Sequence, residues 1–361
     1  MYILTSPFTK TFDTLWLLYF VPDFLEDQIW EGAIVEVPIW TKIENAVVLE
    51  IVKNLENFCV KYEISISEEK IKSVTWVVTQ TQFISKNNII LAQFISEHYF
   101  TQIHNAINLF FPAIVRKKIL WVDEKFFKKL THHQPLPCKE KSSKKFNKLS
   151  GSQEKAYNTI KHNFKIPPSK GGLGGAVFEN LKLGGDLHKK INLLYWITWS
   201  WKTEIYIHLI KKNLEKNKQS LLLIPEIILN NQIWEKLINT FWENVIIINS
   251  SITDTKRAKY FGDIYSWKAK IIIWTRSALF YPYKNLELII MDEEHDNSYN
   301  SDKSPRYKTK EILEKMLGLN PNINILLGSW TPSINSMYKA VKGEWNLINL
   351  LEMFTSSSDS Q

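Results

Sequence analysis

The sequence predicts an α/β protein in which a parallel sheet covered by helices follows a smaller, β-rich N-terminal region. Two observations support this fold class. First, unbroken apolar runs alternate with segments of mostly helical spacing in the C-terminal half, at 191–195, 220–224, 245–248, 270–273, 286–291 and 323–327. Such runs are typical of parallel strands buried on both faces. Second, the region up to about residue 65 contains short β-branched runs between turn candidates, which favour a small barrel or sandwich.

The N-terminal region reads as strands followed by helix. Residues 32–38 and 46–52 are β-branched runs of strand length. From Ser85 to Phe111 the apolar residues recur at helical spacing, and Pro112 ends the pattern. The pattern that follows is mixed and ambiguous.

Two segments without regular spacing separate the predicted domains. Residues 139–148 (KEKSSKKFNK) are charged and contain serines, so we interpret them as a linker whose basic side chains either are solvated or contact DNA. Helical spacing resumes over 149–160, and the glycine-rich stretch 167–185 reads as a flexible insertion. We therefore expect a β-rich domain over 1–108, a segment with a basic linker over 109–148, an α/β lobe over 149–350 and a polar tail over 351–361.

Length, charge and cysteine content narrow the class of protein. The 361 residues suffice for two or three domains, and 45% of them are hydrophobic, as in packed globular proteins. A net charge of +8 favours a polyanionic partner, nucleic acid ahead of a membrane, although lysine-rich sequences are also common in AT-rich genomes. Cys59 and Cys138 lie far apart without a CxxC partner, which indicates neither a zinc site nor a disulfide framework.

The sequence further predicts a cytoplasmic protein that does not enter a membrane. No apolar run reaches the roughly 18–20 residues that a membrane helix needs. The N-terminus also lacks the basic and then apolar pattern of a signal peptide.

One stretch carries the strongest functional signal, but it has tryptophan at positions where the corresponding motif has glycine. It follows an apolar run, precedes a helical segment and reads Trp196-Ile197-Thr198-Trp199-Ser200-Trp201-Lys202-Thr203. With glycine in place of the tryptophans it is the P-loop pattern Gly-x-x-x-x-Gly-Lys-Thr. A P-loop surrounds phosphates with backbone N–H groups at angles that glycine adopts at little cost, whereas three indoles would fill that space.

Composition suggests how the contradiction arises. The chain has 14 tryptophans and only 12 glycines, and together they make up about 7% of it, which is the usual share of glycine alone. Trp274 ends an apolar run, and Trp30 and Trp40 occupy turn positions, where glycine is expected. Some bacterial lineages read UGA as glycine, so we interpret most or all of the tryptophans as glycines. The alternative is a tryptophan-rich protein with a decayed P-loop.

The acidic residues that accompany a P-loop in nucleotide sites appear further along the chain. The apolar run 286–291 delivers Asp292, Glu293, Glu294 and His295 to its end. In such a pair of motifs Lys202 reaches the β- and γ-phosphates, while Thr203 and Asp292 hold Mg²⁺. Glu293 is then the general base that polarises the attacking water. Adjacent carboxylates repel one another, so a bound cation accounts for the cluster.

Two other strand ends carry candidate side chains. Thr275, Arg276 and Ser277 follow one apolar run, and an arginine among hydroxyls suits the phosphates of a nucleic-acid strand. Ser329 and Thr331 follow another run, and their hydroxyls could sense the γ-phosphate and couple hydrolysis to movement. Hydroxyl residues after a strand more often cap a helix, so the order and spacing of these motifs carry the prediction.

Taken together, these motifs resemble those of superfamily 2 helicases and, within them, the family of primosomal protein N′, the bacterial replication-restart helicases. The resemblance covers about 150–345 and is weaker towards the N-terminus, at YFVP (19–22) and GAIVEVPIWTK (32–42). The matching stretches are WITWSWKTEIY (196–206), IPEIILNNQ (224–232), IIIWTRSALFYPYKNLELIIMDEEHDNSY (271–299) and LLGSWTPS (326–333). The third is the most specific.

The resemblance implies a RecA-like P-loop lobe that binds ATP and Mg²⁺, preceded by a domain that binds the 3′ end of a DNA strand and by a winged-helix-like segment at roughly 110–145. It implies that Gln153 contacts adenine and that Arg276 touches single-stranded DNA. The implied activity is ATP-dependent 3′-to-5′ unwinding at branched forks, with primosome and single-strand-binding proteins as partners. The implied nucleotide loop comprises Trp196, Ile197, Thr198, Trp199, Ser200, Trp201, Lys202, Thr203 and Glu204.

The sequence also departs from this family. The second helicase lobe and the zinc-binding cysteines of the family would lie beyond Gln361, so we expect a truncated or split product that hydrolyses ATP poorly. Two alternatives remain open. One is a catalytically inactive DNA-binding protein, which true tryptophans at 196, 199 and 201 would favour. The other is a helicase-like subunit of a restriction system, which would share the lobe motifs but not the TRSALF stretch.

Overall fold

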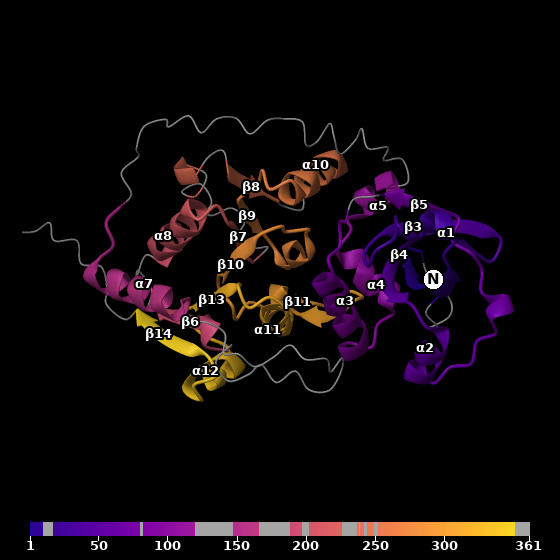
Figure 1. Cartoon of the computed structure of the whole chain (residues 1–361). Coiled ribbons are helices and arrows are strands. Elements are labelled where there is room, and N and C mark those ends of the chain that lie inside the picture. Colours follow the sequence, from indigo (N-terminus) through magenta and orange to yellow (C-terminus); the bar gives the residue numbers. More distant parts are fainter. Residues whose placement is uncertain are drawn as a thin grey trace, which may run out of the picture.

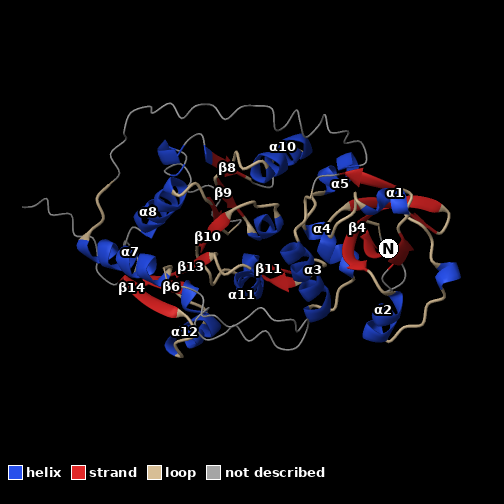
Figure 2. Ribbon diagram, in the orientation of Figure 1, coloured by secondary structure: helices blue, strands red, loops and turns tan. Residues whose placement is uncertain are grey.

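A computed structural model describes the chain apart from several segments. The described residues are 1–9, 17–79, 82–119, 147–165, 188–196, 202–225, 237, 239–241, 244–248 and 252–350. They form a five-stranded and a seven-stranded sheet with surrounding helices (Figures 1 and 2). Most of the winged-helix-like segment and the glycine-rich insertion that the sequence predicts lie outside the described residues.

The N-terminal domain is built on an antiparallel sheet in the order β2-β1-β4-β3-β5. Successive residues of its long strands point to opposite faces, as the pleat requires. Ile34 and Val47 join one buried cluster, while Val35 and Val48 join another. Both faces are therefore covered. The strands are β1 (Tyr2–Pro7), β2 (Leu17–Phe20), β3 (Ile34–Ile39), β4 (Lys42–Val52) and β5 (Trp76–Thr79).

Helices complete this domain. The helical pattern over 85–111 forms two helices rather than one, because Phe100 adopts a left-handed backbone conformation (φ 50°) between them. Ser85 caps the first of the two through a hydrogen bond from the backbone N–H of Asn88. The helices are α1 (Asp23–Glu26), α2 (Leu55–Tyr62), the 3₁₀ helix η1 (Glu68–Lys70), α3 (Lys86–His98), α4 (Ile103–Leu109) and α5 (Ala113–Ile119).

The C-terminal lobe is built on a parallel sheet in the order β14-β6-β13-β10-β7-β9-β8, which confirms the predicted fold class. All six predicted apolar runs form strands of this sheet, and a seventh strand, β14, was not predicted. The strands are β6 (Ile191–Trp196), β7 (Gln219–Leu223), β8 (Val245–Ile247), β9 (Ile271–Trp274), β10 (Leu286–Met291), β13 (Asn324–Ser329) and β14 (Asn346–Leu350).

Helices lie on both faces of the parallel sheet. Helices α7 and α8 cover one face, and α10 and α11 cover the other. The α-helices are α7 (Gly151–Asn163), α8 (Lys202–Glu215), α10 (Asp254–Tyr265), α11 (Thr309–Leu319) and α12 (Ile334–Val341). The shorter elements are η2 (His188–Lys190), η5 (Arg276–Phe280), η6 (Asn297–Tyr299), β11 (Asn300–Ser301) and β12 (Tyr307–Lys308).

The N-terminal domain packs directly on the α10–α11 face of the lobe. One buried cluster runs from the N-terminal sheet, through α3 and α4, to the parallel sheet. Aromatic rings pair across the junction, with centroid distances of 6.1 Å between Phe83 and Phe261 and 5.3 Å between Phe110 and Phe280. The helices of the N-terminal sheet and of the parallel sheet therefore share one apolar core, and such close-packed interiors transmit strain.

Several tryptophans occupy positions that suit glycine better. Trp40, between β3 and β4, and Trp267, after α10, have left-handed backbones with φ of 53° and 63°. A residue with a Cβ pays roughly 1–2 kcal/mol for this conformation. Within the described residues, the buried indole N–H groups of Trp30, Trp267 and Trp345 lack a hydrogen-bond partner. These features agree with the interpretation of tryptophan as glycine, which stays a prediction.

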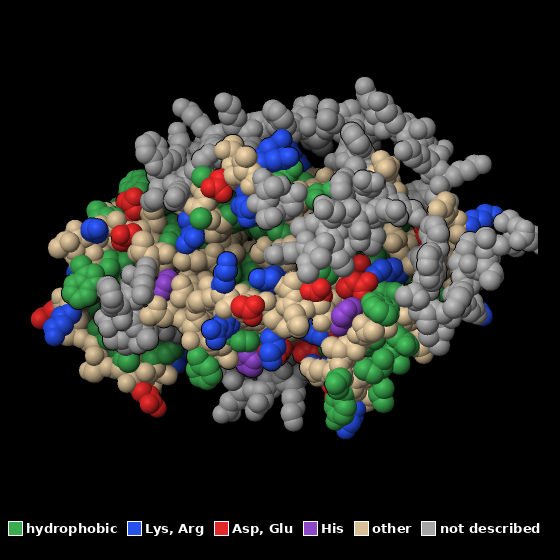
Figure 3. Space-filling model, turned by 180° about the vertical axis from the view of Figure 1, so that it is seen from behind, with side chains coloured by type: hydrophobic (Ala, Val, Ile, Leu, Met, Phe, Trp, Pro, Cys, Tyr) green, Lys and Arg blue, Asp and Glu red, His purple; other side chains and the backbone are tan. Residues whose placement is uncertain are grey.

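Charge is mixed on one face of the molecule. On the face seen in Figure 3, Lys and Arg side chains lie interspersed with Asp and Glu. Among the described residues visible on this face, the net charge of +8 is therefore not gathered in a single-sign patch. None of the helices in the described part of the chain has both the length and the apolar character that crossing a bilayer requires.

Candidate active site

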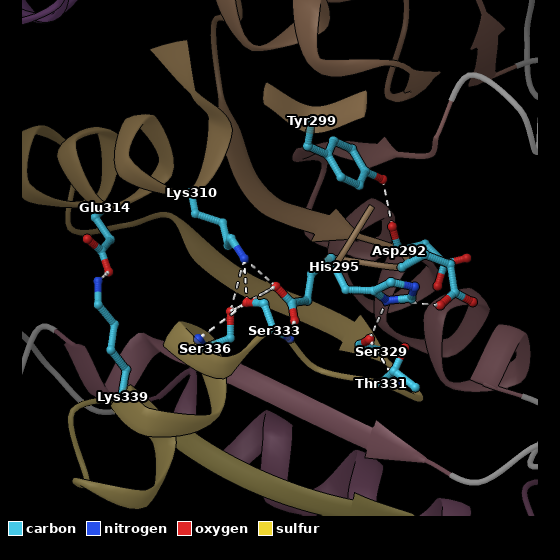
Figure 4. Close-up of polar contacts among 12 residues, drawn as sticks. Asp292, His295, Tyr299, Lys310, Glu314, Ser329, Thr331, Ser333, Ser336 and Lys339 are labelled. Atoms are coloured by element: carbon cyan, nitrogen blue, oxygen red, sulfur yellow. Dashed lines mark hydrogen bonds and ion pairs between the residues drawn. The ribbon is translucent and has the colours of Figure 1, made fainter. Parts of the chain in front are cut away.

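The motifs of the sequence converge at the carboxyl edge of the parallel sheet. Strands β6, β13 and β10 are neighbours and run in the same direction, so their carboxyl ends meet. Lys202 opens α8 after β6, Ser329 ends β13, and Asp292 follows β10. Ligands of open α/β sheets bind at this edge. Figure 4 shows the polar contacts around it.

Lys202 pairs with both candidate carboxylates. Its Nζ lies 2.7 Å from Oδ1 of Asp292 and also forms a short ion pair with Glu293. The side chains are largely buried, with 14% of Lys202 and 1% of Asp292 exposed. Low exposure strengthens such an interaction because water screens it less. The cation that the P-loop pattern supplies and the acids of β10 thus form one charged cluster.

Glu293 has the properties of a proton acceptor. Burial raises the pKa of its carboxyl above the ordinary value, although Lys202 opposes the shift. Among the described residues its buried Oε2 has no hydrogen-bond partner, and Nδ1 of His295 stands 3.8 Å away. Its backbone is left-handed (φ 48°), a conformation that non-glycine residues adopt at a cost and often at functional sites. The carboxylate is therefore oriented and able to accept a proton.

Two tyrosines hold Asp292. The hydroxyl of Tyr206 donates to Oδ1 of Asp292 at 3.0 Å, and that of Tyr299 donates to its backbone carbonyl at 2.6 Å. Complete burial raises the pKa of Tyr206 well above its ordinary value, which keeps the hydroxyl protonated as a donor. The sequence pattern did not single out Tyr206, because this residue occupies an apolar position of the helical segment that became α8.

The end of β13 is tied to the acid cluster. Nδ1 of His295 lies 2.7 Å from Oγ of Ser329, which in turn accepts the backbone N–H of Thr331 at 3.2 Å. The backbone N–H of Glu294 donates to the carbonyl of Gly328 at 2.9 Å. The hydroxyl motif predicted at Ser329 and Thr331 therefore contacts the residues that follow Asp292 and Glu293.

The predicted P-loop is only partly described. Trp196 is buried at the end of β6, and Nζ of Lys202 lies 4.0 Å from the centre of its indole ring. Thr203 and Glu204 belong to the first turn of α8. The carboxylate of Glu204 is buried and accepts a hydrogen bond from Asn147 at 3.0 Å, so it ties α8 to the segment before α7. Outside the described residues lie Ile197, Thr198, Trp199, Ser200 and Trp201.

Gln153 lies in the first turn of α7. Its side-chain oxygen accepts the backbone N–H of Ser150 at 2.8 Å, and Ser150 Oγ accepts the backbone N–H of Gln153, which is a capping box. The side chain is only 3% exposed. Its oxygen therefore caps a helix, and contact of this residue with adenine stays a prediction.

The residues expected to touch DNA lie at the end of β9, two strands away from β10. Arg276 donates to the backbone carbonyl of Ser298, and burial raises the pKa of Tyr307 to about 12 although the positive charge of Arg276 opposes the shift. Thr275 is buried, while Ser277 is exposed. Arg276 thus holds the 298–307 segment close to the sheet.

Known proteins match both halves of the chain. Residues 3–112 match the model of a 3′DNA-binding domain (3′BD), and residues 198–340 match that of DEAD/DEAH box helicases. Three curated proteins named replication restart protein PriA are similar. That of Rickettsia conorii is 30% identical over 93% of this chain and 44% of its own length. That of Helicobacter pylori is 32% identical over 88% and 42%, and that of Haemophilus influenzae is 40% identical over 42% and 21%. The chain thus spans less than half of these relatives.

Proposed function

The chain belongs to the family of the replication restart protein PriA, whose N-terminal part it matches, and from this premise we propose that it binds ATP in its C-terminal lobe and DNA through its N-terminal domain. In the whole protein these parts would serve a 3′-to-5′ replication-restart helicase. The observation that carries the proposal is the contact of Lys202 with Asp292 and Glu293 at the carboxyl edge of the parallel sheet.

The residues present fit Mg²⁺ and a triphosphate. The unpartnered oxygen of Glu293 and the buried carboxylate of Asp292 leave anionic groups in excess of Lys202, which a divalent cation would balance. The described part of the chain contains no group of three or more His, Cys, Asp or Glu side chains that could hold a metal ion by themselves. Mg²⁺ at ATP sites uses one or two carboxylates together with phosphates and water.

Each residue then has a defined task. Thr203 and Asp292 would hold Mg²⁺, Lys202 would supply a cation for the phosphates, and Glu293 would take the proton of the attacking water. Tyr206 and Tyr299 keep Asp292 in place. Mg²⁺, when bound, neutralises charge on the phosphates. Ser329 and Thr331 link this centre to the loop before α12.

We also propose the division into domains. The five-stranded sheet and its helices, within 1–108, would bind the 3′ end of a DNA strand, which the matching 3′DNA-binding domain model supports. Residues 109–148 would be a winged-helix-like segment and linker, 149–350 the ATP-binding lobe and 351–361 a tail. Arg276, with Thr275 and Ser277, would contact single-stranded DNA. Forked DNA, primosome proteins and single-strand-binding proteins are the partners that membership of the family suggests.

Nucleotide binding by the chain tests the proposal. With glycine at positions 196, 199 and 201, ATP and Mg²⁺ should bind measurably in calorimetric titration, and Lys202→Ala should abolish that binding. Lys212→Ala is the matched control, because Lys212 lies on the same helix and pairs only with the exposed Glu215 in the contacts described. Equal ATP affinity in Lys202→Ala and Lys212→Ala would contradict the assignment of Lys202.

A second function stays open because the tryptophans stand in the sequence as given. If the codons for 196, 199 and 201 are UGG, three indoles would occupy the phosphate loop. The lobe would then be a scaffold for a DNA-binding protein without ATPase activity. Sequencing the gene separates the two cases, because UGA at these positions supports glycine.

A further inference from the structure

Helix α11 lies beside α3 of the N-terminal domain (Figure 1), and its residue Lys310 contacts Ser333 in the loop before α12 (Figure 4). It begins shortly after the segment that carries Asp292 and Tyr299 and packs against α3. Two consecutive residues near its start, Lys310 and Glu311, contact different parts of the molecule. Neither residue has a task in the proposed chemistry.

Lys310 holds the loops of the active site together. Its Nζ donates to Oε2 of Glu294 at 2.5 Å, to Oγ of Ser333 at 2.8 Å and to Oγ of Ser336 at 3.1 Å (Figure 4). The side chain of Glu294 is fully buried, and a buried carboxylate requires a cation and hydrogen bonds to remain charged. Lys310 is the cation that contacts it.

Glu294 connects this pair to the proposed catalytic residues. Its backbone follows Glu293 directly and donates to the carbonyl of Gly328. Its carboxylate also accepts the backbone N–H of Ser333 at 2.7 Å and the hydroxyl of Ser336 at 2.8 Å. A second pair, Lys339 to Glu314 at 2.5 Å, ties α12 to α11. A movement of α11 would therefore displace the loop after β10, which carries Glu294, and the loop before α12, which carries Ser333.

Glu311 holds α11 to the N-terminal domain. Its Oε2 accepts the hydroxyl of Tyr99 at 2.6 Å and lies 3.1 Å from Nε2 of His98. The same hydroxyl accepts the backbone N–H of Lys308 at 3.2 Å, and Lys308 Nζ lies 3.1 Å from Oε1. Burial opposes ionisation, yet the hydrogen bonds of Tyr99, Lys308 and His98 hold the pKa of Glu311 below its ordinary value.

Further contacts hold α11 against α3 along its length. Nδ2 of Asn87 donates to the carbonyl of Leu319 at 3.0 Å. Nζ of Lys315 lies 4.9 Å from the ring centre of Phe94. The N-terminal domain therefore holds α11 near its beginning, middle and end, while Lys310 holds it to Glu294 and Glu314 holds it to α12.

We propose that α11 couples the two binding sites, so that DNA bound to the N-terminal domain and nucleotide bound at the acid cluster change each other's affinity through Tyr99–Glu311 and Lys310–Glu294. The inference rests on the proposed function, since it needs both sites. Lys310 and Glu311 are positioning residues in this scheme. Coupling of this kind is reciprocal, so either ligand reports it.

Tyr99→Phe tests the coupling, because it removes the hydroxyl that Glu311 accepts and keeps the ring. The nucleotide is the β,γ-imido analogue of ATP with Mg²⁺, and the DNA is a single-stranded oligonucleotide with an accessible 3′ end. In the chain with glycine at 196, 199 and 201, DNA should change the Kd of the nucleotide by about 5-fold or more. Tyr99→Phe and Glu311→Gln should bring that factor close to 1 while each Kd measured alone stays within about 2-fold.

Tyr62→Phe is the matched control, since the hydroxyl of Tyr62 donates to Glu50 at 2.9 Å inside the N-terminal domain. It should keep the full coupling factor. Coupling that survives Tyr99→Phe, or that Tyr62→Phe abolishes equally, would overturn the proposal.

Hydrogen–deuterium exchange separates failure of the coupling from failure of the proposed function. DNA alone should slow exchange in α11 and in residues 292–299, and Tyr99→Phe should remove this effect beyond the N-terminal domain. DNA that binds without changing exchange there would overturn the coupling and leave the function standing. If neither ligand binds, the proposed function fails and the coupling fails with it.

Discussion

The end of β10 and the end of β6 lie on either side of β13 at the same edge of the parallel sheet, yet they differ in how well they suit a phosphate. After β10, Asp292 has Tyr206 and Tyr299 as donors, and Glu294 has Lys310. After β6, the sequence has tryptophans where phosphate-binding loops have glycine. A site that had decayed would lose side-chain partners on both sides. Here the acid side keeps them, which favours glycine on the other side.

Two turns of the N-terminal sheet also differ in this way: one requires glycine and has it, and the other suits glycine but has tryptophan. Gly32 has φ +90°, and a Cβ there would come within 2.2 Å of the carbonyl oxygen of Ile84, so only glycine fits. Trp40 lies at the next turn of the same sheet with a left-handed backbone, and 80% of its side chain is exposed. A large exposed indole gains little in a conformation that disfavours it.

Removing Lys310, the cation that pairs with the buried Glu294, should have the largest effect on stability. Lys310→Met leaves Glu294 buried and uncompensated, so the free energy of unfolding should fall by about 3 kcal/mol, the low end for buried ion pairs. Urea denaturation measures it. Lys339→Met is the control, because Glu314 keeps 18% exposure whereas Glu294 keeps none; its cost should be smaller than that of Lys310→Met, about 1–2 kcal/mol. If the free energy of unfolding fell equally in both variants, burial of Glu294 would not make it more dependent on its cation than Glu314 is.

Glycines at the end of β6 should have the next largest effect. Replacing Trp196, Trp199 and Trp201 together with glycine should tighten binding of ATP and Mg²⁺ by at least about 100-fold, or roughly 2.7 kcal/mol. The reason is that the phosphates gain access to the backbone N–H groups of the loop. Calorimetric titration compares the two chains. Unchanged affinity would remove the contrast between the ends of β6 and β10.

Most of the fold followed from the sequence because parallel strands are apolar throughout. Strand β14 was missed because it lies at the edge of the sheet, where Asn346 and Asn349 interrupt the apolar run. The break between α3 and α4 was missed because it depends on the left-handed backbone of Phe100. Local pattern does not encode either feature.

The site was predictable where motifs place residues at strand ends. Lys202, Asp292 and Glu293 were assigned by spacing, and the structure brings them into contact. Tyr206 and Lys310 were not found, since they reach the site from helices and their partners are distant in sequence. A buried tyrosine and a helical lysine look ordinary until the tertiary structure brings their partners near.

A methyl group between the two strand ends should have a moderate effect. In Gly328→Ala, the new Cβ would lie 2.1 Å from the hydroxyl of Tyr206 and 2.9 Å from the ring of Trp196. Relief of this overlap displaces the donor of Asp292, so stability should fall by about 1–3 kcal/mol. Thermal unfolding measures it. Gly151→Ala, where a Cβ meets nothing within 4 Å, should be nearly neutral. A neutral Gly328→Ala would mean that Tyr206 is not confined.

The smallest effect concerns backbone conformation alone. Trp40→Gly should stabilise the chain by about 1 kcal/mol, because the left-handed backbone costs a residue with a Cβ roughly 1–2 kcal/mol and glycine loses part of that gain through its more flexible unfolded chain. Trp76→Gly should instead destabilise by about 0.5–1 kcal/mol, since Trp76 is also exposed but lies in strand β5. Denaturant titration of both variants gives the sign. Opposite signs at two exposed tryptophans tie the effect to φ, whereas the same sign in both would make hydrophobic contact its cause.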